Sequence, residues 1–218
     1  MADTAKNAVA GVVLAGGLAR RMGGGDKTLK DVGGRPILAM VIDRITPQVA
    51  GLAINANGDP KRFAAFGLPV IADTIAGFAG PLAGVLAGMH WAKTNHPDRR
   101  YLASVAGDTP FFPADLVARL AEGCGDTDDT IALAASADGI HPVFGLWPLA
   151  LVDDLEDFLT KGDDRKILAF TDRYVRLNVP FDHIQLADGE PLDPFFNINA
   201  PEDVERAEAI MQALGEAA

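Results

Sequence analysis

Short apolar runs alternate with segments of helical period along the first half of the chain. Runs rich in Val, Ile and Leu predict strands buried on both faces, because such strands lack the alternation of a half-exposed sheet. We predict four such strands, at residues 9–15, 52–55, 70–72 and 101–106. Apolar positions at helical spacing predict helices from Ile37 and over residues 81–94. The alternating order predicts an α/β fold with a doubly wound, mostly parallel sheet.

The second half of the chain has a less regular pattern. We predict strands at residues 130–135, 143–147 and 174–179, helices from Pro113, over 149–159 and from Pro201, and a short element at 166–170. Neither an internal repeat nor a linker rich in Pro, Gly or Ser interrupts the sequence. We therefore expect residues 1–218 to form a single domain, with a substrate-binding subregion from about residue 109.

Polar residues follow several predicted strands at the point where each strand ends. Gly16-Gly17, Asn55, Asp73 and Asp108 all occupy such positions. In open parallel sheets, ligands bind outside the carboxyl ends of the strands. The pattern therefore predicts a binding site at this edge of the sheet.

The segment from Leu14 to Lys27 combines the end of a strand with five glycines and the cations Arg20, Arg21 and Lys27. Glycines allow the backbone to approach a phosphate closely, and the cations supply the charge that a triphosphate requires. Asp26 stands where a P-loop needs glycine, and the dinucleotide-binding spacing is not matched either. The segment therefore predicts a triphosphate-binding loop that is neither a P-loop nor a dinucleotide-binding loop.

Composition and charge exclude some function classes. The formal net charge of −11 argues against nonspecific binding to nucleic acid, which requires a basic surface. No apolar stretch reaches the ~18 residues of a membrane span. The single cysteine, Cys124, cannot form an intrachain disulfide, and we interpret it as a passive loop thiol. We expect a cytoplasmic enzyme that binds neither nucleic acid nor membranes.

Several motifs together resemble one family. Leu14-Ala-Gly-Gly, Arg21-Met-Gly, Asp26-Lys27 and Gly80-Pro-Leu-Ala-Gly84 are similar to motifs of the molybdenum cofactor guanylyltransferases, and the likeness runs from about Val12 to Glu208. The resemblance implies a Rossmann-like, three-layer α/β/α fold of the nucleotide-diphospho-sugar transferase type. It also implies transfer of GMP from GTP to the terminal phosphate of molybdopterin, with Mg²⁺ as cofactor and pyrophosphate as product. Residues 8–108 would bind GTP, and residues 109–218 the acceptor.

The resemblance assigns roles to particular residues. Asp108, in Asp108-Thr-Pro, corresponds to the family's magnesium ligand, in agreement with the preference of Mg²⁺ for carboxylate oxygen. Lys27 and Arg21 would neutralise the triphosphate and join Asp108 as catalytic residues. GTP would contact, besides Lys27 and Asp108, Leu14, Ala15, Gly16, Gly17, Asn55 and Asp73. Asn57 is an alternative to Asn55, and both Asn and Asp are also favoured in turns for local reasons.

Two later motifs suggest where the acceptor binds. His141-Pro142 resembles the family's His-Pro segment near the acceptor, so His141 is either a pterin contact or a structural residue. The stretch from Asn197 to Glu202 resembles the family's Asn-x-Asn-x-Pro-Glu motif, with Ala200 where Thr is usual. Asn197 and Asn199 are therefore acceptor-binding candidates, although Asn199 is also suited to cap the following helix.

Other functions remain alternatives on the sequence alone. A molybdopterin cytidylyltransferase or a sugar-phosphate nucleotidyltransferase would share the same motifs. A noncatalytic nucleotide-binding regulator is an alternative of another class, although it would not need to retain both Lys27 and Asp108. Because the product is labile, we also expect transient contact with molybdoenzymes or cofactor carriers.

Overall fold

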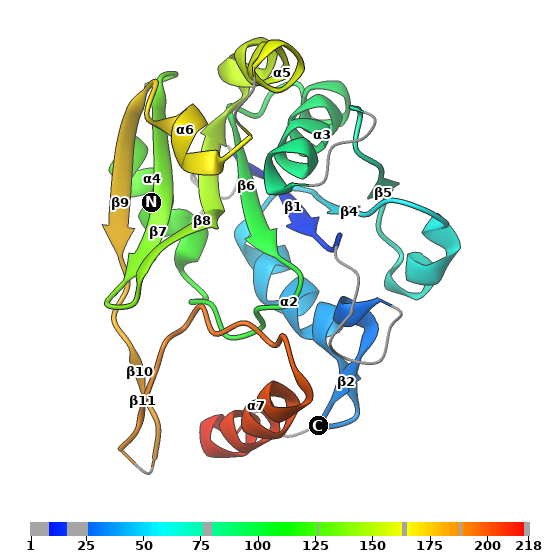
Figure 1. Ribbon diagram of the computed structural model, residues 1–218, viewed down its shortest axis with the longest axis vertical. Helices are drawn as coiled ribbons and strands as arrows, with labels where there is room; N and C mark the ends of the chain where they lie inside the picture. The colour runs from blue at the N-terminus through cyan, green and yellow to red at the C-terminus, as the bar shows by residue number, and fades with distance from the viewer. Residues whose placement is uncertain are drawn as a thin grey trace.

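The computed structural model describes residues 9–16, 26–75, 80–125, 127–162, 165–187 and 189–215, so the predicted sites Gly17, Arg20 and Arg21 lie outside the described residues. Seven strands form one sheet with helices on both faces (Figure 1). The strands of this sheet are β1 (Val9–Leu14), β4 (Leu52–Asn55), β5 (Val70–Ile71), β6 (Tyr101–Ala106), β7 (Thr130–Ser136), β8 (Gly139–Pro148) and β9 (Val175–Pro180).

The strand order is β5-β4-β1-β6-β8-β7-β9. Strands β5, β4, β1 and β6 pair in parallel, as do β7 and β9. Strand β8 is antiparallel to both of its neighbours. The mostly parallel sheet that the alternating pattern predicted is confirmed, and β8 is the exception.

Two helical layers cover the sheet. Helices α2 (Ile37–Ile45) and α4 (Leu116–Cys124) pack on one face, and α3 (Pro81–Asn95), α5 (Val152–Lys161) and α6 (Ile167–Thr171) pack on the other. Strand residues alternate between these layers: Val9 and Val13 join the first core, and Ala10 and Val12 join the second. Burial on both faces explains why β1 is a continuous apolar run. The predicted three-layer α/β/α arrangement is confirmed.

A third, smaller core lies beyond the end of the sheet. Helix α7 (Pro201–Leu214) contributes Met211 and packs there with Val32, Phe111 and Ile198. Two short hairpins flank it, β2 (Asp31–Val32) with β3 (Arg35–Pro36), and β10 (Ile184–Gln185) with β11 (Pro191–Leu192). In Figure 1, α7 and the β10–β11 hairpin project below the sheet. This core holds the segment around Ile198 against the end of β6.

Some predicted boundaries were wrong. Helix α4 begins at Leu116, three residues after Pro113, whose carbonyl accepts a hydrogen bond from the Leu116 N–H at 3.1 Å. The helix predicted from residue 149 begins as a 3-10 turn, η4 (Leu149–Leu151), before α5. Cys124 is not a loop thiol, because it is the buried last residue of α4.

Three further 3-10 segments complete the described chain: η1 (Lys27–Leu29), η2 (Thr46–Gln48) and η3 (Pro60–Phe66). The two-residue strands β2, β3, β10 and β11 and the 3-10 segments η1, η2 and η3 carry no clear periodic signal in the sequence, and they were not predicted. Within the described ranges, no helix combines the length and apolar character needed to cross a bilayer.

Candidate active site

The carboxyl ends of the parallel strands are aligned. Leu14, the last residue of β1, is in register with Asn55 on one side and with Ala106 on the other. Backbone hydrogen bonds continue beyond the strands, from Ala15 N to Asn55 O at 2.9 Å and from Gly107 N to Leu14 O at 2.9 Å. The polar residues that follow β1, β4, β5 and β6 therefore lie along one edge of the sheet, as predicted.

Lys27, Asp108 and Asn199 meet at this edge from three separate segments. Lys27 opens η1, Asp108 follows β6, and Asn199 precedes α7. The Lys27 Nζ lies 2.6 Å from Asp108 Oδ2 and also donates to Asn199 Oδ1. The Lys27 and Asp108 side chains are only 12% and 24% exposed, so this ion pair is less screened than a surface pair. A cation therefore already sits against two convergent oxygens.

Thr109 and Asn197 hold the other side of Asp108. The Thr109 hydroxyl lies 3.1 Å from Asp108 Oδ1 and also donates to Asn197 Oδ1. Ile198 N donates to Asp108 O at 3.0 Å, which joins the 197–199 segment to the end of β6. Thr109 is fully buried. Sequence analysis missed Thr109, and its position between Asp108 and Pro110 was the only available signal.

The cap of helix α7 does not use the Asn199 side chain. Asp203 Oδ2 accepts from the backbone N–H of Asn199 at 2.7 Å and of Ala200 at 2.8 Å. Ala200 stands at the N-cap position and has no side-chain acceptor. The helix start therefore keeps only the half of a capping box in which the side chain at the third helical position, Asp203, accepts from the N-cap backbone N–H. The Asn199 amide oxygen faces Lys27 instead. Of the two interpretations of Asn199, this geometry favours the site over the cap.

Asn55, Asp73 and Asn57 form a second polar group at the same edge. Asn55 Nδ2 donates to Asp73 Oδ1 at 3.0 Å and to Ile71 O at 3.3 Å. Asn57 Nδ2 donates to Asp73 Oδ2 at 2.7 Å, and Asp73 N donates to Asn57 Oδ1 at 3.0 Å. Both asparagines therefore orient the Asp73 carboxylate, and the preference for Asn55 as the nucleotide contact stays a prediction.

Gly84 of helix α3 makes room for Asn55. A Cβ at Gly84 would lie 2.3 Å from Asn55 Oδ1 and 2.9 Å from Leu14 Cδ2. Real Cβ atoms essentially never approach other atoms that closely. The glycine therefore allows α3 to pack tightly against the ends of β1 and β4.

Arg62 connects the Asn55–Asn57–Asp73 group to the segment that carries Lys27. Its Nη1 lies 2.7 Å from Asp26 Oδ1, and its Nη2 donates to Asn57 O at 2.5 Å. Asp26 directly precedes Lys27, so this ion pair fixes the backbone from which the lysine extends. The exposed segment around Arg62 carried no sequence signal for this role.

His141 lies in a separate polar group. Its ring stacks on Phe195 with the centroids 4.3 Å apart, and its Nε2 lies 2.8 Å from Ser136 Oγ. Ser136 also donates to Asp193 Oδ2 at 3.1 Å. Burial lowers the pKa of His141 below its usual value, partly offset by Asp193 and Asp138. Among the described residues, His141 contacts Phe195, Ser136 and Asp193, so it is not part of the Lys27–Asp108 group.

Ser136, His141 and Asp193 do not form a nucleophilic triad. In a triad the carboxylate binds the imidazole nitrogen that faces away from the serine. Here Asp193 Oδ2 approaches the same nitrogen, Nε2, at 3.5 Å, and it binds the serine hydroxyl directly. The arrangement is therefore suited to holding a neutral ring in place.

The mostly parallel sheet, with its polar groups at aligned strand ends, defines a nucleotidyltransferase fold of the nucleotide-diphospho-sugar transferase type. The sequence profile of the MobA-like NTP transferase domain matches residues 11–177. The chain belongs to this family of nucleotidyltransferases, which confirms the class of enzyme predicted from the sequence.

Curated relatives are similar over almost their whole length. The molybdenum cofactor guanylyltransferase of Rhodopseudomonas palustris strain BisB5 is 55% identical over 91% of this chain and 92% of its own. The protein of the same name from Bradyrhizobium sp. strain ORS 278 is 50% identical over 96% of both chains. The chain therefore belongs, within the family, with the molybdenum cofactor guanylyltransferases, as the motifs indicated.

A solved structure supports the fold. The molybdopterin-guanine dinucleotide biosynthesis protein A of Archaeoglobus fulgidus superimposes with a TM-score of 0.68, covering 93% of this chain and 98% of that one. Its sequence identity is 24%, so this likeness bears on the fold alone.

Proposed function

We propose that this chain transfers GMP from GTP to the terminal phosphate of molybdopterin and releases pyrophosphate. The observation that carries the proposal is the convergence of Lys27, Asp108 and Asn199 at the strand ends. Their chemistry suits a polyphosphate and a cation, and the chain is 55% identical to a molybdenum cofactor guanylyltransferase.

GTP would bind along the edge formed by the first half of the chain, residues 8–108. The backbone of Leu14, Ala15 and Gly16 passes between the ends of β4 and β6 and is placed to approach the nucleotide. Asp73, held by Asn55 and Asn57, offers acceptor oxygens to the purine edge or to a ribose hydroxyl. Gly17 is expected to continue the backbone contact.

Asp108 and Asn199 fit a divalent cation. Their oxygens already converge on the Lys27 ammonium, and an all-oxygen donor set suits Mg²⁺, which binds through few carboxylates and retains several waters. Bound there, Mg²⁺ would neutralise charge on the α-phosphate. The 197–199 segment holds Asp108 in place, because Ile198 N donates to Asp108 O and Asn197 binds the neighbouring Thr109 hydroxyl.

The reaction requires positioning and charge neutralisation more than proton transfer. An oxygen of the acceptor phosphate attacks the α-phosphorus in line and forms a P–O bond, while the bond to the β-phosphate breaks and pyrophosphate leaves. The attacking oxygen is already anionic, so no general base is needed. Lys27 would neutralise the charge that develops on the leaving group, and Arg21 is expected to assist.

The acceptor would bind to the second half, residues 109–218. Asn197 contacts Thr109 and Asn199 contacts Lys27, which supports both amides as acceptor contacts near the proposed reaction centre. His141, whose lowered pKa favours the neutral ring, is a pterin contact in this proposal and not a base. Transfer of the product to a molybdoenzyme or cofactor carrier in the cytoplasm stays a prediction.

The test is pyrophosphate release by the purified protein with Mg²⁺ and molybdopterin, with GTP, CTP, ATP or UTP supplied separately. Release with GTP alone, and none without molybdopterin or in Asp108→Asn, is the expected result. Release with CTP alone would instead mean that the protein is a cytidylyltransferase. GTP binding without any release, given active molybdopterin, would instead favour a noncatalytic regulator.

A further inference from the structure

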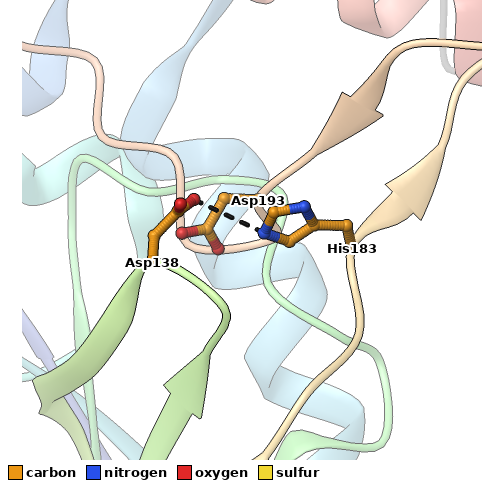
Figure 2. Close-up of side chains that lie close together, drawn as sticks. All are labelled: Asp138, His183 and Asp193. Carbon is orange, nitrogen blue, oxygen red and sulfur yellow. Dashed lines mark ion pairs between the residues drawn. The ribbon is translucent and has the colours of Figure 1, made fainter.

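Three metal-binding side chains meet at the base of the β10–β11 hairpin (Figure 2). Asp138 lies in the turn between β7 and β8, His183 directly precedes β10, and Asp193 directly follows β11. One ligand atom of each residue lies within 4.8 Å of those of the other two. The cluster therefore joins both ends of the hairpin to a turn about 50 residues earlier in the sequence.

His183 offers a nitrogen that lacks a hydrogen bond. Its Nε2 is shielded from solvent and has no hydrogen-bond partner. The Asp138 Oδ2 oxygen lies 3.4 Å from this nitrogen. A buried polar atom without a partner destabilises the fold. A metal bound to this nitrogen would remove that cost.

Asp193 is held in one orientation, whereas Asp138 is free to adjust. Asp193 Oδ1 accepts from the Phe195 N–H at 2.8 Å, and Oδ2 accepts from Ser136 Oγ at 3.1 Å. Such outer hydrogen bonds are typical of carboxylates that bind metals. The Asp138 side chain is 63% exposed, so it has room to move the short distance that closes a coordination shell.

We propose that Asp138, His183 and Asp193 bind a divalent transition metal of the Zn²⁺ class. One imidazole nitrogen with two carboxylate oxygens suits zinc or cobalt, whereas Mg²⁺ prefers oxygen alone. A bound cation would also relieve the repulsion between the two carboxylates. This site differs in ligand chemistry from the all-oxygen site proposed at Asp108.

The metal would anchor the hairpin and the segment that follows it. Asp193 begins the stretch that leads to Asn197 and Asn199, and this stretch contacts Thr109 and Lys27. A metal that joins both ends of the hairpin to the β7–β8 turn would fix the position of Asp193, where the segment that leads to Asn197 and Asn199 begins. The inference does not depend on the proposed function, because the cluster binds metal without nucleotide or acceptor.

The test is a titration of the metal-free protein with Co²⁺, without nucleotide, followed by visible absorption. Cobalt in a site of low coordination number with an imidazole ligand gives strong d–d bands, whereas octahedral oxygen ligation gives weak ones. We expect strong bands at one equivalent of Co²⁺, displaced by Zn²⁺ and retained in Asp108→Asn. His183→Gln and Asp138→Asn should weaken binding by at least about tenfold.

Asp182→Asn is the matched control, since it removes the same charge from an exposed position beside His183. It should leave the cobalt bands and the affinity unchanged. Circular dichroism of each metal-free variant checks that it folds. Asp138→Asn changes an exposed side chain, so it tests the site even if His183→Gln disturbs folding. Weak bands alone in the wild type, unchanged binding in His183→Gln, or equal loss in Asp182→Asn would overturn the proposal.

Discussion

Lys27 and Asp108 are 81 residues apart in the sequence, and the Lys27 Nζ lies 2.6 Å from Asp108 Oδ2. Neither residue would make this contact without the sheet, because β1 and β6 pair in register and end together. Lys27 also donates a hydrogen bond to Asn199, in the segment before α7. Lys27, proposed to bind phosphate, and Asp108, the proposed metal ligand, therefore form one unit, and changes at either residue should affect the other.

Replacing Lys27 with Ala should lower pyrophosphate release about 10²-fold. Loss of one preorganised charge at the reacting phosphates is equivalent to ~3 kcal/mol of transition-state stabilisation. Steady-state kinetics with GTP and molybdopterin measures this effect. Lys93→Ala removes an exposed lysine near the end of α3 and should leave turnover unchanged. Wild-type turnover in Lys27→Ala would remove the lysine from the mechanism.

Lys27→Met should strengthen binding of Mn²⁺ in the absence of nucleotide. The ammonium occupies the two oxygens proposed for the metal, so a cation must displace it or share them with it. An affinity gain of about tenfold corresponds to ~1.4 kcal/mol, a modest fraction of the interaction between adjacent charges near a protein surface. Electron paramagnetic resonance of free Mn²⁺ measures the affinity, and Lys93→Met is the control. Weaker binding in Lys27→Met would show that the lysine supports the metal.

The sheet and the main site positions were predictable because they depend on local patterns. Buried strands produce continuous apolar runs, and the doubly wound topology places their carboxyl ends together. Asp73 and Asp108 could therefore be assigned to one edge before any contact was known. Lys27 and Asn199 were predicted from the family motifs. Lys27 contacts both Asp108 and Asn199, and these three residues come from segments that are distant in sequence.

The contacts that orient these residues were not predictable. Thr109 contacts Asp108 and Arg62 contacts Asp26 only in the folded chain, and the same holds for His183 and Asp138. Arg62 lies in an exposed 3-10 segment without a motif, and His183 precedes a strand of two residues. A single sequence carries no periodic signal for such positions.

Stability should depend on pH through His141. Burial lowers the pKa of His141 below its usual value of 6.5, so the unfolded chain binds a proton at a higher pH than the folded chain. The stabilising contribution of the neutral ring is present above about pH 6.5 and is lost as the pH falls toward the folded-state pKa. Urea unfolding at pH 8 and at lower pH measures this loss. In His141→Phe, which retains a ring against Phe195, the free energy of unfolding should fall less over the same range. Parallel pH curves for the two proteins would contradict this assignment.

Gly84→Ala should disturb the nucleotide side of the site more than the fold. The new Cβ would lie 2.3 Å from Asn55 Oδ1, so the amide must rotate or α3 must shift. Either movement breaks the hydrogen bond from Asn55 Nδ2 to Asp73, which contributes about 1 kcal/mol, and should raise the KM for GTP about fivefold or more. The KM for molybdopterin should stay near the wild-type value, because the proposed acceptor residues Asn197 and Asn199 are held by Thr109 and Lys27 and not by Asn55.

Gly80→Ala is the matched control for that change. It adds the same methyl group at the N-cap of the same helix, where a Cβ meets nothing within 4 Å. Thermal unfolding of both variants separates a local effect from general destabilisation. A raised KM for GTP in Gly84→Ala with a nearly unchanged melting temperature would link the close packing of α3 to nucleotide binding. Equal increases in both KM values, or the same increase in Gly80→Ala, would instead mean that Asn55 does not position the nucleotide, since the effect would no longer follow the clash.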